Sequence, residues 1–256
     1  MHLRFCPSRV KSGPQLSIVP SRSIERRDDA ACAAAGMNGT GRKVVVWDAP
    51  TRLFHWLAAV LVVAAYVTWR LNWMDWHARV GSALLALLWF RLFWGLFGSE
   101  TARFSCFLVS PRHAARHLAR TFWREPDRQA GHNPAGGWMV MLILALLFGE
   151  TLTGLYVAND VADEGPLTQL VPAPAANAIT ALHSIFWDAL LAAVLLHVLA
   201  IFVYAVAKGH NLLLPMITGR KSLPPSVPVP RMVGNARAAA LLACGAALTA
   251  LLANYL

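Results

Sequence analysis

Charged residues are scarce in this chain. Lys, Arg, Asp and Glu make up only 14 % of its 256 residues, while apolar residues make up 57 %. An ordinary soluble domain carries about a quarter charged residues. The composition therefore argues against a soluble globular domain and favours a protein that is embedded in a membrane.

Cysteine patterns that hold metal centres are also missing. The sequence has 4 cysteines, and no two of them form a Cys-x-x-Cys pair. This excludes a c-type haem attachment site, a zinc ribbon and an evident set of iron–sulfur ligands.

Residues 1–36 contain no apolar run of the length that a signal peptide needs. We expect residues 1–43 to form a disordered tail, and Met37 is the translation start that we favour over Met1.

Two of the long connections between apolar segments carry charges of one sign only: 208–237 has no acidic residue, and 159–180 has no basic residue. The connection 208–237 has basic residues and no acid, and the connection 99–136 is rich in arginine. In contrast, the connection 159–180 carries Asp160, Asp163 and Glu164 and no base. By the positive-inside rule, the N-terminus and both basic connections are cytoplasmic. The net charge of +10 is then explained by topology, and nucleic-acid binding is not needed to account for it.

Five apolar segments are long enough to cross the hydrocarbon core of a bilayer, which is about 30 Å thick. The sequence thus predicts an all-α membrane protein, with a four-helix transmembrane bundle and a fifth, C-terminal transmembrane helix. The last segment is the shortest, and a hydrophobic tail lying on the membrane surface is its alternative. The segments are 53–69, 80–97, 138–158, 181–207 and 238–253.

Four histidines fall within or at the ends of these segments. His183 and His197 are fourteen residues apart, which on one helix separates them by about 21 Å and leaves them on nearly the same face. His55 and His77 fall at matching depths on other helices. Two layers of two histidines predict two haem b groups, one held by His55 and His197 and the other by His77 and His183. A zinc or copper ion needs three or four ligands around one point, which this spacing does not provide.

Three other ionisable residues lie inside the predicted spans. Arg91 either reaches toward the lipid headgroups or binds a haem propionate, so it is a candidate cofactor-binding residue. Glu150 either relays protons to a quinone or bonds to a neighbouring helix. Asp188 lies on a different face from His183, and we assign it no role.

Further histidines lie in the basic connections. His113 and His117 stand four residues apart, as on a metal-binding helix, but the surrounding arginines favour an amphipathic stretch on anionic lipid. His132 and His210 are candidates for lining a quinone or partner site.

Residues 46–56 (VWDAPTRLFHW), residues 131–137 (GHNPAGG) and the His183/His197 pair resemble the bacterial cytochrome b561 and NiFe-hydrogenase cytochrome b family. The resemblance covers residues 44–223. It implies a diheme b-type cytochrome domain of the inner membrane, in which His55 and His197 hold the inner haem and His77 and His183 the outer one. Residues 224–256 then form a linker and the fifth helix.

The resemblance also implies a function. We expect an electron-transfer protein, or a subunit of a respiratory oxidoreductase, that works between the quinone pool and a redox partner. That partner is a periplasmic or membrane-bound cytochrome, or a hydrogenase or dehydrogenase subunit. The alternative is a haem-free transporter that uses the intramembrane histidines, Glu150 and Asp188 to move protons or cations. A colourless purified protein would favour the transporter.

Overall fold

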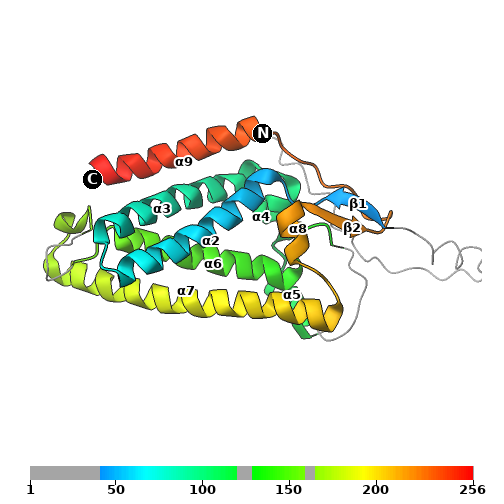
Figure 1. The fold of residues 1–256 in the computed structure, drawn as a ribbon, viewed down its shortest axis with the longest axis horizontal. Helices are drawn as coiled ribbons and strands as arrows, with labels where there is room; N and C mark the ends of the chain where they lie inside the picture. The colour runs from blue at the N-terminus through cyan, green and yellow to red at the C-terminus, as the bar shows by residue number, and fades with distance from the viewer. Residues whose placement is uncertain (1–40, 120–128, 159–164, 256) are drawn as a thin grey trace, which may run out of the picture.

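The fold is dominated by long apolar helices that run side by side (Figure 1). It is a computed structural model that describes residues 41–119, 129–158 and 165–255. Within these residues, 5 helices are long and apolar enough to span a membrane. This confirms the predicted all-α membrane fold. The helices are α2 (Ala49–Arg70), α3 (Met74–Phe97), α6 (Pro134–Gly154), α7 (Ala173–Lys208) and α9 (Asn235–Tyr255).

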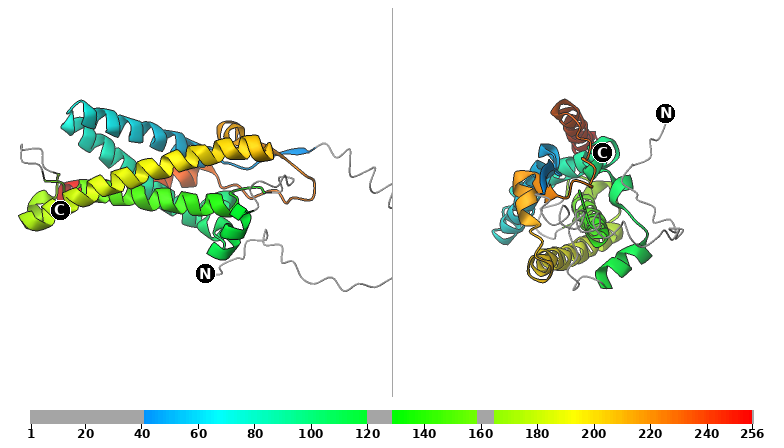
Figure 2. Two further views of the ribbon diagram at one scale, coloured as in Figure 1. Left: turned by 90° about the horizontal axis from the view of Figure 1, so that it is seen from below. Right: turned by 90° about the vertical axis from the view of Figure 1, so that its right-hand side faces the viewer.

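The long helices pack against one another in pairs. Helix α3 packs against α2, α6 and α9, and α6 also packs against α7. Figure 2 shows the bundle from below and end-on, with α9 lying on its outer side. Small and branched apolar side chains form the core between α2, α3, α6 and α7: Ala58, Leu84, Leu88, Leu144, Leu147 and Leu190. Many other large apolar side chains are exposed on the helices, as lipid-facing residues should be.

Helix α7 differs from its predicted bounds. It begins at Ala173 rather than at residue 181, and its 36 residues span about 54 Å. The predicted span omits its first two turns, which consist mostly of alanine with Asn177 and Thr180, but proline in the first turn starts the helix there. With this length, α7 exceeds the thickness of the hydrocarbon core, which is about 30 Å.

The starts of α2 and α6 are capped in the same way. Asp48 accepts a hydrogen bond from the Thr51 amide at 2.8 Å, and Asn133 accepts one from the Gly136 amide at 2.6 Å. In both helices a proline follows in the first turn, where its missing N–H has no partner to lose.

Two short strands close one end of the bundle. Strand β1 (Arg42–Val45) pairs antiparallel with β2 (Arg220–Leu223), and the amides of Val46 and Trp47 both donate to the Gly219 carbonyl. We call this end the strand end, and the opposite end, where α2 turns into α3 at residues 71–73, the turn end. The strands were not predicted, and β1 begins inside the predicted tail; residues 1–40 lie outside the described residues.

Shorter helices complete the strand end. Helices η1 (Glu100–Ala102), α4 (Phe104–Phe107) and α5 (Pro111–Ala119) connect α3 to α6, and α8 (Leu213–Thr218) connects α7 to β2. At the turn end, η2 (Thr168–Leu170) precedes α7. The acidic residues predicted in connection 159–180 lie outside the described residues.

Candidate functional site

The histidine layer nearer the strand end is formed by α2 and α7. The rings of His55 and His197 lie with their centroids 6.4 Å apart at an interplanar angle of 55°. The two helices are not among the closely packed pairs, so the rings meet across a wider interhelical spacing. The Nδ1 atom of His55 is buried and has no hydrogen-bond partner in the described part of the chain.

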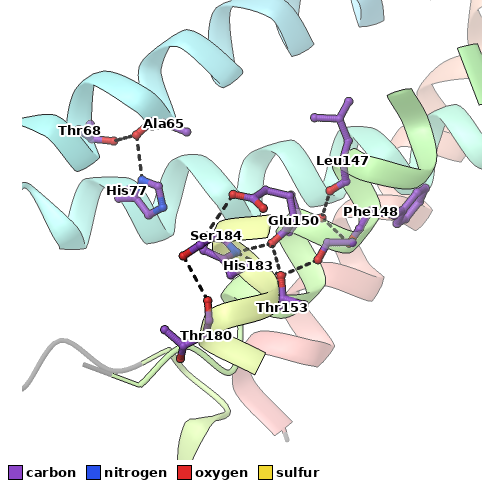
Figure 3. Close-up of polar contacts among 12 residues, drawn as sticks. Ala65, Thr68, His77, Leu147, Phe148, Glu150, Thr153, Thr180, His183 and Ser184 are labelled. Atoms are coloured by element: carbon purple, nitrogen blue, oxygen red, sulfur yellow. Dashed lines mark hydrogen bonds and ion pairs between the residues drawn. The ribbon is translucent and has the colours of Figure 1, made fainter. Parts of the chain in front are cut away.

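The layer nearer the turn end is formed by α3 and α7. His77 stands in the first turn of α3, and its Nδ1 lies 2.9 Å from the Ala65 carbonyl oxygen on α2 (Figure 3). His183 has two partners at Nδ1, the Glu150 carbonyl oxygen at 3.0 Å and the Thr153 hydroxyl at 3.1 Å. With Nδ1–H donated to a carbonyl, the lone pair of Nε2 is left to bind a metal.

Glu150 also meets His183 through its side chain. Its Oε1 lies 3.3 Å from His183 Nε2, while Oε2 is buried without a hydrogen-bond partner among the described residues. Of the two roles considered for Glu150, the bond to a neighbouring helix matches this contact. Asp188 is exposed on α7.

These residues fit a haem iron. An imidazole nitrogen binds a metal at about 2 Å, so two rings on opposite sides of one iron have centroids on the order of 6 Å apart. The His55 and His197 rings have this separation. At the turn end, a Cβ on Gly81, one turn from His77 on the same face, would meet no atom within 4 Å, which leaves room for a flat macrocycle. A metal bound at His183 Nε2 would replace the Glu150 contact, which the long, rotatable carboxylate side chain permits.

No described group of three or more His, Cys, Asp or Glu residues is arranged to hold a metal ion. Of the four predicted ligands, His55 and His197 form a pair whose rings lie next to each other. Haem suits such pairs because its macrocycle supplies the remaining iron ligands.

Arg91 on α3 is almost completely buried, with 3 % exposure. Its guanidinium lies over the Phe104 ring, 5.0 Å from the centroid, and Nη1 has no hydrogen-bond partner within the described ranges. Arg91 therefore does not snorkel into solvent in this structure. A buried cation with a free donor suits an anionic ligand group.

Sequence reasoning missed some of the groups that orient the histidines. The carbonyl oxygens of Ala65 and Glu150 position His77 and His183, but a backbone carbonyl leaves no sequence signal. Thr153, whose hydroxyl also contacts His183, was not predicted as part of the site. Its spacing of three residues from Glu150 on α6 was the one available hint that both face the same neighbour.

The fold and these histidines define a class: a multi-pass helical membrane protein with half-buried imidazoles near both ends of its bundle. The sequence matches the family described as prokaryotic cytochrome b561 over residues 46–219. The match covers more than half of the chain, and the protein belongs to this family. It is thus a membrane b-type cytochrome of the electron-transfer class. No curated protein and no solved structure matches the chain.

Proposed function

We propose that the protein carries electrons across the bacterial inner membrane, between the quinone pool and a redox partner, through two haem b groups. His55 and His197 hold one haem, and His77 and His183 hold the other. The observation that carries the proposal is the 6.4 Å separation of the His55 and His197 rings. Family membership favours haem over the haem-free transporter that the sequence alone left open.

Haem iron supplies one-electron redox chemistry, and two imidazole ligands leave it without an open position. The protein residues fix the orientation and surroundings of each ligand. The Ala65 and Glu150 carbonyls accept from Nδ1 of His77 and His183, which holds each ring in one tautomer and makes Nε2 more basic. Arg91 offers its buried charge to a haem carboxylate, as one of its two sequence interpretations predicts.

The charges at the strand end support a cytoplasmic location for it. Basic residues of the described ranges gather in the elements of this end: Arg42, Lys43, Arg103, Arg112, Arg116, Arg220 and Lys221. By the positive-inside rule this end and the N-terminus face the cytoplasm, and the turn end faces the periplasm. Labelling of a single cysteine placed in the turn 71–73 by a membrane-impermeant reagent tests this orientation, and protection of that cysteine in intact cells would contradict it.

The redox partner on this side is a cytochrome or a hydrogenase or dehydrogenase subunit. The acidic connection 159–180, which would meet a basic partner surface, lies partly outside the described residues. Cross-linking from cysteines introduced at 165–169 tests this interaction, and failure to capture any co-purifying redox protein would count against it.

A haem count tests the ligand assignment. The purified protein should give a b-type reduced-minus-oxidised spectrum and two haems per chain by pyridine hemochrome. Alanine at His55 or His197 should remove one haem, and alanine at His77 or His183 should remove the other. The matched control is His113→Ala, an exposed histidine on α5, which should keep both. A colourless protein would overturn the proposal in favour of the transporter.

A further inference from the structure

Arg91 is a buried cation whose nearest acid is already engaged. The Asp48 carboxylate acts on its charge, yet no ion pair joins the two residues within the part of the chain that is described. Both Asp48 oxygens accept other hydrogen bonds, from the Thr51 amide at 2.8 Å and from Trp94 Nε1 at 3.2 Å. The charge of Arg91 is therefore only partly compensated, and its surroundings favour a further anion.

His132 is linked to Arg91 through the rings of Phe104 and Phe107, and it has a buried ring nitrogen without a partner among the described residues. Its ring lies between the rings of Trp47 and Phe107, with both centroids 4.6 Å away, and its buried Nδ1 has no hydrogen-bond partner among the described residues. Burial, followed by the charge of Arg91, lowers the pKa of His132 to about 3. The ring is thus neutral at physiological pH and carries one N–H that can be donated.

A third polar atom belongs to Thr101, which packs against Gly131, the residue before His132. The Thr101 hydroxyl is buried and also lacks a partner in the described ranges. Thr101 packs against Gly131, where a Cβ would lie 3.6 Å from the Thr101 Cβ. Unsatisfied buried polar atoms are rare in folded proteins, and three of them in neighbouring elements indicate a ligand that satisfies them together.

The aromatic contacts connect these groups into one layer. Arg91 lies over Phe104, Phe104 contacts Phe107 edge-on at 5.9 Å, and Phe107 contacts His132. His132 precedes the first turn of α6 and contacts Trp47, which precedes α2, so both stand nearer the strand end than His55 does. The layer therefore lies on the strand-end side of the first histidine pair.

We propose that His132, together with Arg91 and Thr101, binds a carboxylate of the haem held by His55 and His197. The inference rests on the proposed function, and it adds His132 and Thr101 as binding residues. His132 donates its N–H, Arg91 supplies the charge and Thr101 donates its hydroxyl. The GHNPAGG segment then has a chemical role, because its histidine fixes which edge of the macrocycle faces the strand end.

The test compares haem with haem dimethyl ester, whose carboxylates are blocked. The full-length His77→Ala chain, prepared without haem, keeps only the first histidine pair and is titrated with each porphyrin by Soret absorbance. His132→Phe keeps the aromatic contacts and removes the N–H; His113→Phe is the matched control on exposed α5. Loss of one hydrogen bond to a charged group corresponds to about tenfold or more in affinity.

We expect His132→Phe to weaken haem binding about tenfold and ester binding little, with Thr101→Val acting in the same direction and His113→Phe having no effect. An equal loss for both porphyrins would overturn the inference and assign His132 to packing alone. If the His77→Ala chain that keeps His132 bound haem and haem dimethyl ester with equal affinity, the inference would be overturned too. In both cases the proposed function stands, because both porphyrins still bind. Absence of binding by either porphyrin would overturn the proposed function and this inference with it.

Discussion

Glu150 contacts His183 through two separate groups. Its carbonyl oxygen lies 3.0 Å from Nδ1 of the ring, and its carboxylate oxygen Oε1 lies 3.3 Å from Nε2. Only the second contact depends on the side chain. The backbone carbonyl can therefore hold the ring whatever residue stands at position 150, while the carboxylate competes for the nitrogen that would bind iron.

Glu150→Ala should accordingly keep two haems per chain. The Nδ1 contact survives the substitution, and Nε2 is left without a competing partner. The pyridine hemochrome count of the purified variant measures this, with His183→Ala as the variant that should lose one haem. Glu150→Gln keeps the side-chain volume and separates an effect of charge from an effect of packing. Loss of one haem in both Glu150 variants would show that the carboxylate itself is required.

Gly154 leaves little room beside His183. A Cβ at this position would lie 3.2 Å from Cε1 of the His183 ring, tighter than ordinary van der Waals contact. Gly154→Ala should displace the ring slightly, and Gly154→Leu should abolish the haem at the turn end. The number of haems per chain, together with the absorbance spectrum of the one haem that remains, measures this. Gly234→Ala, where a Cβ would meet no atom within 4 Å, should change nothing. Two full haems in Gly154→Leu would contradict the His183 assignment.

The pH dependence of stability should report His132. Burial, with the Arg91 charge as second cause, lowers the pKa of His132 in the folded chain to about 3, against about 6.5 when unfolded. Between these values the unfolded chain binds a proton that the folded chain does not. The free energy of unfolding therefore falls as pH drops below about 6.5, by at most about 1.4 kcal/mol per pH unit.

This dependence is measured as the change in Tm of the haem-free protein between about pH 7.5 and about pH 5.5. His132→Asn removes the titrating group, so its Tm should fall less over this range. The control is His113→Asn, on the exposed face of α5. Its Tm should fall over this pH range by as much as that of the unsubstituted protein. A His132→Asn protein that loses as much Tm as the unsubstituted one would mean that His132 is not held neutral by the fold.

Helix α9 depends on a close approach to α3. A Cβ on Gly245 would lie 2.8 Å from the Ala86 carbonyl oxygen, so no larger residue fits without separating the two helices. Gly245→Leu should lower Tm by several degrees, while the haem content is kept because the four histidines lie on α2, α3 and α7. Ala246→Leu, one residue further on an exposed face, is the matched control and should leave Tm unchanged. Equal melting of both variants would contradict this packing.

The membrane spans and the layering of the histidines were predictable because both follow from simple periodicities. An apolar run of sufficient length predicts a span, and fourteen residues on a helix return to nearly the same face; His183 and His197 do lie on one helix, α7. The capping of α2 by Asp48 was equally predictable, since an acidic side chain ahead of a proline marks a helix start.

The remaining features depend on contacts between segments that are distant in sequence. Strands β1 and β2 are four residues each and contain Arg and Lys, so neither has an apolar alternation that reveals it. The hydrogen bonds that orient His77 and His183 go to carbonyl groups, which every residue has. His132 was identified only as lining a site, because its neighbours Trp47 and Phe107 come together through the tertiary fold.

The pairing of β1 with β2 also sets an order of events during synthesis. Strand β1 is made before any of the four histidines, whereas its partner is made after His197. The Gly219 carbonyl, which accepts hydrogen bonds from the amides of Val46 and Trp47, is likewise made after His197. Since chains fold from the N-terminus as they are made, the strand end closes only after α7 is complete. The β1–β2 pair thus joins the two ends of the segment that carries all four histidines, so its formation reports that this whole segment is in place.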